Sequence, residues 1–331
     1  MMITANNGFI EQSERYAFNN AGESLKKYIL LEKGELAYNH GASKLRPYGS
    51  CFALTTAENA RIPFVYHCFS VENQNAEFMS IELNSSEIEN QLRKIVSSGA
   101  RMDGLLNISF DEYSSVSVVL PSIEEQDRIA GFLRNLDRLI TLHQRKYDKL
   151  TKVKKAMLEK MFPENGSPYP EIRFKGFTDA WEQRKLGDIA SDMVAGGDID
   201  KDLILAEGQY PVIANALTGD GIVGYYDKEY RVNAPAVTVT GRGDVGHAKA
   251  RLVNFTPVVR LLSVKSEHDV FFLENVINTL KIVIESTGVP QLTVPQLAKY
   301  EVAFPRQLDE EEHIGAFFKQ LDHLITLHQR M

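Results

Sequence analysis

The sequence predicts an α+β fold in which two β-rich domains are each followed by a long helix, and the two helices pack as an antiparallel coiled coil. The first observation behind this prediction is a repeat, because residues 139–145 recur without change at 324–330. The second is that matches at the same shift extend upstream, where Glu125 corresponds to Glu310. A shift of roughly 185 residues is far longer than the ~20–50 residues of a solenoid unit. It therefore indicates two domain-sized units that end in the same helix.

The first long helix is strongly signalled from Ser122 onward. Ser122 and Glu125 have the spacing of a capping box, and carboxylates in the first turn suit the positive end of the helix dipole. Apolar residues then recur at alternating steps of four and three, which is a heptad seam. No Gly or Pro interrupts residues 145–160, and about forty residues at ~1.5 Å each give a rod of about 60 Å. Such a rod needs a partner, and the second copy, from about Leu308, is the candidate.

The predicted seams take one set of residues from each helix. They are Ile129, Leu133, Leu136, Ile140, His143, Tyr147 and Leu150 in the first helix, and Ile314, Phe318, Leu321, Ile325 and His328 in the second. We expect the first four residues of each set to pack antiparallel, because a duplicated chain with a short linker allows a pseudo-twofold arrangement. An aspartate at Leu136 should then cost several kcal/mol. Residues 146–161 would lack an intact partner, and would recruit another protein or form the more mobile end of the rod.

Two interpretations are open for His143 and His328, which occupy equivalent seam positions. They could be a polar device that fixes the register of the helices, or ordinary half-buried histidines whose hydrogen bonds are satisfied.

The composition is that of a globular protein with real apolar cores. The chain has 331 residues, of which 44% are hydrophobic, and this length predicts about two domains. Cys51 and Cys68 lack metal-ligand spacing and indicate a reducing compartment. No signal peptide or membrane-spanning run is visible, so we expect a soluble, cytoplasmic chain with no membrane partner. A net charge of −7 argues against indiscriminate coating of nucleic acid, but it allows a local basic face.

The repeat and a proline-rich linker set the predicted domain boundaries. They are 1–121 for the first β-rich domain, 122–162 for the first long helix, 163–176 for the linker, 177–305 for the second β-rich domain and 306–331 for the second long helix. The first domain begins at residues 3–6, which resemble 212–215, so it lacks a counterpart of 177–211. The second helix lacks a counterpart of 146–162. We therefore expect the first domain to be incomplete at its N-terminus and the second helix at its C-terminus.

Residues 241–246, here called the glycine loop, form the most distinctive polar motif. Their spacing is that of a GxGxxG dinucleotide-binding loop, but that fingerprint needs a following helix, whereas residues 247–255 alternate like a strand. We therefore predict a glycine-rich hairpin that lets backbone approach a ligand closely. Arg242, Lys249 and Arg251 would then suit a polyanion. A tight turn with solvated arginines is an equally open interpretation of this stretch.

Recognisable catalytic motifs are missing from the sequence. It contains no Walker A motif, no Asn-Pro-Pro-aromatic methyltransferase motif, no HExxH and no CxxC pair. No spacing of histidines or carboxylates isolates a catalytic pair. We therefore expect a non-catalytic protein with a recognition surface, which binds no metal and no cofactor of its own.

Several segments taken together carry a family resemblance. In the first half they are residues 121–162 and the loop that contains Tyr38, Asn39, Ser43, Lys44 and residues 47–49; in the second half they are residues 170–177, 181–188, 240–246 and 288–292. With these segments the chain resembles the specificity subunits of type I restriction–modification systems. The likeness covers nearly the whole chain and includes several independent motifs.

The resemblance implies two target-recognition domains that each read one half of a bipartite DNA sequence, with the helices fixing the spacing. The candidate DNA-contacting residues are Asn39, Ser43, Lys44 and Arg46 in the first domain and Thr240, Arg242, Gly243, Lys249 and Arg251 in the second, of which Arg46, Lys249 and Arg251 are included for their positive charge in or beside these loops. For Arg242 we favour a phosphate contact over base reading, because a glycine-flanked loop approaches the DNA backbone most easily.

The resemblance also implies partner subunits that carry the chemistry. Two copies of a modification subunit would dock on the helices and recognition domains, and would methylate adenine with S-adenosylmethionine as donor. A separate motor-nuclease restriction subunit would use ATP and Mg²⁺ to translocate and cleave DNA.

Two other functions remain open from the sequence. A rearranged, truncated variant could bind the modification subunit through its helix without reading DNA productively. Alternatively, the chain could be a fragment of a fused restriction–methylation enzyme whose Asn-Pro-Pro motif lies in a neighbouring reading frame.

Overall fold

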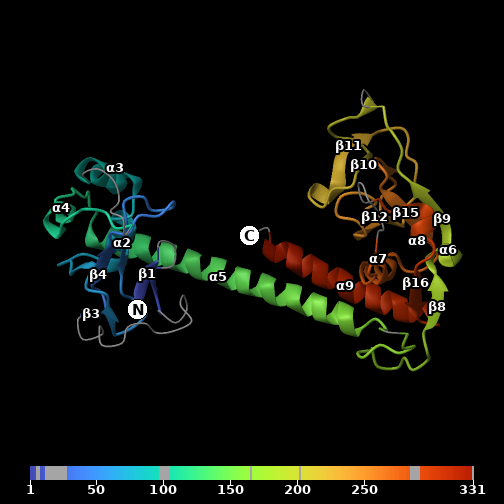
Figure 1. Ribbon diagram of the computed structural model, residues 1–331, viewed down its shortest axis with the longest axis horizontal. Helices are drawn as coiled ribbons and strands as arrows, with labels where there is room; N and C mark the ends of the chain where they lie inside the picture. The colour runs from blue at the N-terminus through green and yellow to red at the C-terminus, as the bar shows by residue number, and fades with distance from the viewer. Residues whose placement is uncertain are drawn as a thin grey trace. The chain divides into compact units, whose positions relative to one another are not determined.

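The computed structural model has the predicted α+β composition, with small sheets and helices of very different lengths (Figure 1). It describes residues 1–4, 8–11, 28–96, 104–164, 166–200, 203–283 and 291–329. The chain forms two compact units, Met1–Ile140 and Thr141–Met331. The boundary falls inside the long helix α5 (Ile123–Lys160), so each unit contains one part of that helix.

The first unit consists of short antiparallel strands covered by short helices. Its strands are β1 (Met2–Thr4) paired with β2 (Gly8–Ile10), β3 (Ile29–Glu32) paired with β6 (Asn59–Ile62), and β4 (Leu36–Asn39) between β5 (Ser50–Ala53) and β7 (His67–Phe69). Its short helices are α2 (Ala76–Glu82), α3 (Ser86–Ile95) and α4 (Phe110–Ser114). The core contains Tyr38, whose ring stacks on that of Tyr113 with a centroid separation of 3.8 Å.

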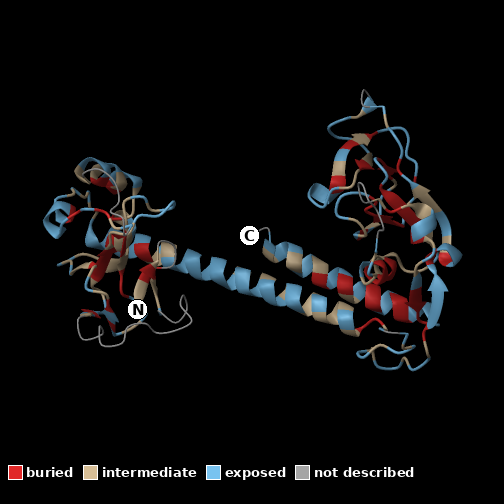
Figure 2. Ribbon diagram, in the orientation of Figure 1, coloured by how far each residue is buried: buried red, intermediate tan, exposed pale blue. Residues whose placement is uncertain are grey.

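The second unit has a larger antiparallel sheet, with strand order β13 (Ala248–Arg251), β12 (Ala236–Val239), β15 (Leu262–Ser266) and β9 (Ala190–Ala195). Beside it, β10 (Tyr210–Ile213) lies between β11 (Ile222–Tyr226) and β14 (Thr256–Pro257), and β8 (Glu182–Lys185) pairs with β16 (Glu301–Phe304). The helices are α6 (Leu186–Ile189), the 3-10 turn η3 (Gly219–Gly221), α7 (Val270–Asn278), α8 (Val294–Leu297) and α9 (Leu308–Gln329). The buried core gathers where α7, α9 and the larger sheet meet (Figure 2).

The predicted capping box at the start of α5 is confirmed. The Glu125 carboxylate accepts a hydrogen bond from the backbone N–H of Ser122, with a distance of 3.1 Å. The Ser122 hydroxyl oxygen accepts one in return from the N–H of Glu125 at 3.4 Å. Two donors that a helix start leaves unpaired are thereby satisfied.

The first turn of α5 is anchored to the first unit by a buried glutamine. The side chain of Gln126 is 0% exposed, and its Oε1 accepts a hydrogen bond from the backbone N–H of Asn75 at 3.1 Å. Asn75 is the N-cap of α2. Gln126 also donates from Nε2 to the side-chain oxygen of Gln74 at 2.6 Å. The start of the long helix is thus tied to the start of α2.

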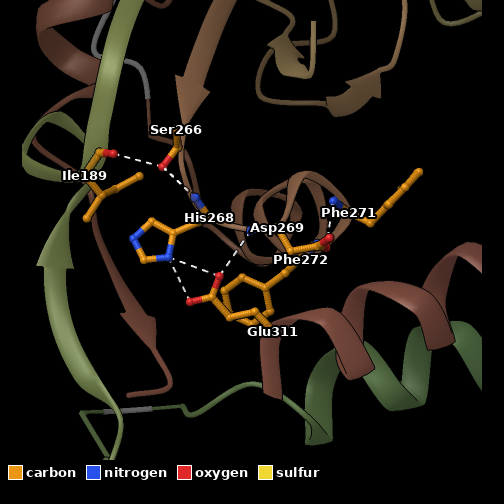
Figure 3. A network of polar contacts seen from close by, with 7 residues as sticks. All are labelled: Ile189, Ser266, His268, Asp269, Phe271, Phe272 and Glu311. Carbon is orange, nitrogen blue, oxygen red and sulfur yellow. Dashed lines mark hydrogen bonds and ion pairs between the residues drawn. The ribbon is translucent and has the colours of Figure 1, made fainter. Parts of the chain in front are cut away.

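The first turn of α9 is anchored to the second unit in the same way, but by a carboxylate. The buried Glu311 accepts a hydrogen bond from the backbone N–H of Asp269, the N-cap of α7, at 3.2 Å (Figure 3). It also contacts His268 Nδ1 at 2.8 Å. The helices approach so closely that a Cβ at Gly315 would collide with the Asp269 carboxylate. The internal repeat therefore includes a tertiary contact as well as a helix sequence.

The C-terminal part of α5 runs antiparallel to α9 within the second unit. Lys154 Nζ lies 2.5 Å from Asp322 Oδ1, and His143 Nδ1 lies 2.8 Å from His328 Nδ1, so residue numbers rise along α5 as they fall along α9. The two histidines are therefore hydrogen-bond partners, one donating and the other accepting. Desolvation and the neighbouring His143 and Lys146 charges lower the pKa of His328, which suits the neutral form that such a pair requires.

This register differs from the predicted pairing of the seams. One core cluster contains Ile314, Phe318 and Leu321 of α9 together with Met161 and Phe162, and half-buried Leu150, Val153, Met157 and Leu158 pack against it. The physical reason is that the segment after α5 is held against the start of α9, where Arg173 forms a bidentate ion pair with Glu310, so the end of α5 lies beside α9. The expectation that residues 146–161 lack an intramolecular partner is therefore wrong.

The remaining apolar residues of the first seam are largely exposed. Ile129, Leu136 and Ile140 are 41%, 43% and 55% exposed. Together with the exposed Phe132 and Leu139 they form an apolar strip on the N-terminal part of α5, here called the α5 stripe. The other predicted seam residues, Leu133, Tyr147 and Ile325, are half-buried. Since Leu136 is exposed, an aspartate there should be tolerated, which corrects the predicted loss of several kcal/mol.

Glu274 on α7 is a half-buried carboxyl group beside the helix pair. Burial raises its pKa from 4.5 to about 7, and the Asp322 carboxylate adds to the effect while Lys154 opposes it. Above pH 4.5 the unfolded chain has lost a proton that the folded chain keeps until about pH 7. The contribution of this group to the free energy of unfolding therefore falls as the pH rises through that window.

Replacing Glu274 with glutamine should remove this dependence. We compare the free energy of unfolding of Glu274→Gln with that of the wild type. The difference, variant minus wild type, should be on the order of 2–3 kcal/mol larger at pH 8 than at pH 5. Urea denaturation followed by the fluorescence of Trp181, the single tryptophan, which is buried in the second unit, measures the difference. Glu312→Gln, at an exposed position of α9, is the matched control. Equal pH dependence in the wild type and Glu274→Gln would contradict the prediction.

Candidate nucleic-acid interface

The glycine loop joins β12 to β13 as a hairpin. Thr240 closes it, because its N–H donates to the His247 carbonyl at 2.9 Å and its own carbonyl accepts from the Gly246 N–H at 2.9 Å. The predicted hairpin is confirmed, since an antiparallel strand follows the loop where a dinucleotide-binding fingerprint would require a helix. The buried Thr240 is therefore a structural residue of the loop.

The glycines of the loop have different roles. A Cβ at Gly241 would collide with the backbone carbonyl oxygen of Arg260, and would lie 3.1 Å from that of Leu292. Gly241 thus allows the loop to press against neighbouring backbone. Gly243 has open space around it and a φ of 73°, a conformation that glycine adopts without strain. Gly246 also has a positive φ, of 94°, so two glycines let the hairpin turn.

Arg242 lies at the exposed tip of the hairpin. Its Nη2 is 3.3 Å from the side-chain oxygen of Gln291, and the two residues also form an isolated backbone bridge. Its guanidinium makes no ion pair within the described part of the chain. Gln291 was not among the predicted contacts, although it stands in a segment that carries the resemblance. Residues 288–290 of that segment lie outside the described residues.

The two other cations predicted near this loop have partners inside the unit. Lys249 forms an ion pair with Asp220 of η3. Arg251 Nε donates to the Thr238 hydroxyl oxygen at 3.0 Å, and burial lowers the pKa of Arg251. Lys249 is exposed and its ion pair can open, whereas Arg251 is held against its own sheet. Of the three cations predicted near this loop, Arg242 thus has the greatest freedom to bind a ligand.

The loop after β4 in the first unit is held largely by its own hydrogen bonds. Ser43 Oγ accepts from the N–H of Arg46 at 3.0 Å, and Arg46 Nη1 donates to the Asn84 carbonyl at 2.7 Å. The Asn39 side chain links the end of β4 to β1 and to the start of the loop. Lys44 is exposed. Of the residues predicted here, Lys44 is the cation that faces solvent.

The two loops occupy the same place in their units. The Leu106 N–H donates to the His40 carbonyl at 2.8 Å in the first unit, and the Leu292 N–H donates to the Gly241 carbonyl at 2.9 Å in the second. Each loop follows a strand that is paired on both sides. In the first unit this is β4, between β5 and β7, and in the second unit it is β12, between β13 and β15. The chain therefore presents two topologically equivalent loops, one from each unit.

The described residues contain no group of three or more His, Cys, Asp or Glu side chains that could hold a metal ion. Among the helices of the same residues, none is long and apolar enough to cross a membrane.

Comparison with known proteins places the chain in a family. The family model for the type I restriction modification DNA specificity domain matches residues 178–331. A Mycoplasma pneumoniae protein assigned as a type I specificity subunit, S.MpnORF289P C-terminus, is 30% identical over 103 residues, which are 30% of this chain and 70% of that protein. The chain belongs to the type I specificity subunit family. The predicted resemblance is thereby confirmed.

Longer relatives of this specificity subunit match over part of their length. S.MpnORF507P of Mycoplasma pneumoniae is 27% identical over 218 residues, 64% of this chain and 57% of the relative. S.MpnORF89P of the same organism is 27% identical over 160 residues, 47% of this chain and 47% of the relative. This specificity subunit thus spans about half the length of each of the two relatives.

Solved structures share the fold of this specificity subunit. The type I restriction–modification S subunit from M. genitalium aligns over 92% of this chain and 80% of its own, with a TM-score of 0.61 and 13% identity. A structure concerned with complex assembly and conformational transition of the type I R-M system aligns over 91% and 77%, with a TM-score of 0.50 and 17% identity. At these identities the likeness establishes the fold alone.

The close packing at Gly241 gives a testable expectation. Gly241→Ala should lower the free energy of unfolding by about 1–3 kcal/mol, because the added methyl group meets backbone rather than a flexible side chain. Gly197→Ala is the control, since the nearest atom to its Cβ would be the end of the Arg231 side chain at 3.3 Å. Urea denaturation followed by Trp181 fluorescence measures both. If the two variants are equally stable, the glycine loop is not packed as described.

Proposed function

We propose that this specificity subunit reads a bipartite DNA sequence for a type I restriction–modification complex. Each β-rich unit would contact one half-site, and the long helices would set the distance between them. The observation that carries the proposal is the equivalence of the two loops, which leave central strands and are tied by the same kind of backbone hydrogen bond. Two equivalent surfaces in one chain suit a target with two parts.

The helices would serve as a spacer between two target-recognition domains, packed as an antiparallel coiled coil. The Lys154–Asp322 ion pair and the His143–His328 hydrogen bond support this role, because they hold α5 along α9 at two separate points. The 38 residues of α5 span about 57 Å at ~1.5 Å per residue. Pairing with α9 would stiffen the C-terminal part of α5, and the exposed N-terminal part would continue the spacer as a single helix.

For the glycine loop, we propose a contact with the DNA backbone through Arg242. The residue is exposed, carries no ion pair within the described residues, and is flanked by glycines that allow close approach. An arginine guanidinium binds phosphate bidentately, with shorter and stronger hydrogen bonds than a neutral donor makes. Thr240 and Gly243 would shape the loop, and Lys249 would add charge once its ion pair with Asp220 opens.

The chemistry would belong to partner subunits in the cytoplasm. Two modification subunits would methylate adenine with S-adenosylmethionine, and a motor-nuclease subunit would use ATP and Mg²⁺ for translocation and cleavage; this chain would bind none of these cofactors. The α5 stripe is our proposed docking surface for a modification subunit, because contiguous exposed apolar residues commonly mark protein–protein contacts.

A second candidate function is an interaction protein that binds the modification subunit without reading DNA. The observation that favours it is that several predicted DNA-contacting cations already have partners. Arg46 donates a hydrogen bond to the Asn84 carbonyl, and Arg251 donates one to the Thr238 hydroxyl. Lys249 forms an ion pair with Asp220.

Native mass spectrometry together with DNA binding separates the two functions. The chain mixed with its modification subunit should give a stable complex, and that complex should bind random-sequence duplex DNA with an affinity that falls linearly with salt on logarithmic axes. Assembly without DNA binding would favour the interaction protein. Absence of both would exclude the proposal.

A substitution in the α5 stripe tests the docking surface. Leu136→Asp should reduce assembly at least tenfold while the circular dichroism of the chain stays unchanged, because Leu136 is 43% exposed. Thr141→Asp adds the same charge on another side of the helix, about 140° away, and should leave assembly intact. Equal assembly by both variants would mean that the modification subunit docks elsewhere.

A further inference from the structure

Asn215, which follows β10, joins separate segments of the second unit through one side chain. Its Oδ1 accepts hydrogen bonds from the N–H of Gly241 at 2.7 Å and from the N–H of Arg242 at 3.3 Å. Its Nδ2 donates to the carbonyl of Val259 at 2.5 Å. One amide group therefore fixes both the start of the glycine loop and the turn between β14 and β15.

That turn is strained. Val259 and Arg260 have φ values of 50° and 68°, in the left-handed region that is unfavourable for L residues and most of all for a β-branched one. The Val259 N–H donates to the Gly197 carbonyl at 3.2 Å, and the Arg260 N–H donates to the Gly196 carbonyl at 2.9 Å. Strained backbone persists where surrounding contacts over-determine it, and such places are concentrated at functional sites.

Arg242 of the glycine loop and Arg260 of the turn between β14 and β15 therefore lie on backbone segments that contact each other. Gly241 packs so closely on the Arg260 carbonyl that a Cβ would not fit, and Arg242 is the next residue of the loop. Both arginines are exposed. Neither makes an ion pair with another described residue, in contrast to Lys249, which is paired with Asp220. This point of the second unit therefore presents two arginines without an ion pair to a described residue, while the nearby Asp244 carboxylate of the glycine loop is engaged by His247 at 3.1 Å.

Two exposed arginines on adjacent backbone segments suit a ligand with repeated negative charges. A single base edge offers one bidentate acceptor pair, whereas a DNA strand offers a phosphate at every nucleotide. Binding two phosphates requires the guanidinium groups to keep a fixed separation, since otherwise side-chain and loop entropy is lost on binding. The Asn215 amide supplies that constraint at the level of the backbone.

We propose that Asn215 is a positioning residue that holds Arg242 and Arg260 together as a two-arginine contact to the phosphate backbone of DNA. This inference rests on the proposed DNA-reading function and adds Arg260 and Asn215 to its residues. Sequence reasoning did not find Arg260, because its position follows from a strained turn and from packing across the unit.

Fluorescence anisotropy with the chain assembled with its modification subunit and a labelled random-sequence duplex, over a series of KCl concentrations, tests the arginines. Arg242→Ala and Arg260→Ala should each reduce the slope of log affinity against log salt by about 0.9, the value for one phosphate contact. At 0.1 M salt this corresponds to roughly tenfold weaker binding. Arg184→Ala, at an exposed position of β8, is the control and should leave both the slope and the affinity unchanged.

A double-mutant cycle tests the positioning role of Asn215. Asn215→Ala should weaken binding in the wild-type background but add no further loss when Arg242 and Arg260 are both alanine, because it acts through them. A merely structural defect would weaken binding in both backgrounds.

The outcomes separate this inference from the proposed function. If the wild type binds duplex DNA with a clear salt slope, and Arg260→Ala changes neither slope nor affinity, the two-arginine contact is overturned while DNA binding stands. Additive losses in the cycle would overturn the role of Asn215. If the wild type does not bind duplex DNA at all, the proposed function fails and this inference fails with it.

Discussion

One buried polar side chain in the first turn of each long helix ties that helix to its β-rich unit, and it fixes where the helix leaves the unit. Gln126 and Glu311 are both buried, and each accepts a hydrogen bond from the N-cap residue of a neighbouring helix. A buried polar group that loses its hydrogen-bond partner lowers the free energy of unfolding by about 1–3 kcal/mol. The start of each long helix and the N-cap residue it contacts therefore hold each other in place. In α9 a second carboxylate adds to the anchor. Glu310 accepts two hydrogen bonds from the Arg173 guanidinium, at 2.7 and 2.8 Å.

The distribution of charge bears on how such a chain would recognise DNA. The protein as a whole is acidic, with a net charge of −7, and Arg46, Lys249 and Arg251 have partners within their own units. Most of the affinity for DNA phosphates would therefore depend on a few exposed cations such as Lys44 and Arg242. A protein of this kind binds non-specific DNA weakly, since that binding is mainly electrostatic. Recognition would depend on placing a small number of contacts correctly, which the anchored helices and closed loops favour.

Local features were predictable from the sequence because their causes are local. The capping box at Ser122, the hairpin of the glycine loop and the duplicated helix follow from residue spacing alone. The register of α5 against α9 was not predictable from the sequence, because it depends on the tertiary packing of Phe162 against Phe318. Gln126 and Glu311 lie in first turns where polar residues usually face solvent, so their burial could not be read from the pattern. The resemblance between residues 3–6 and 212–215 was the one sequence signal that pointed toward Asn215; Asn6, its counterpart, lies outside the described residues.

Sequencing of methylated adenines in cells that carry this gene with its partner subunits tests whether this chain directs methylation to a bipartite DNA sequence. Methylation is expected at one motif made of two short sequences separated by a constant number of bases. Deleting this gene alone should abolish methylation at that motif, because the modification subunit would lose its means of reading DNA. If the pattern of methylated adenines is unchanged after the deletion, this chain does not direct the methylation.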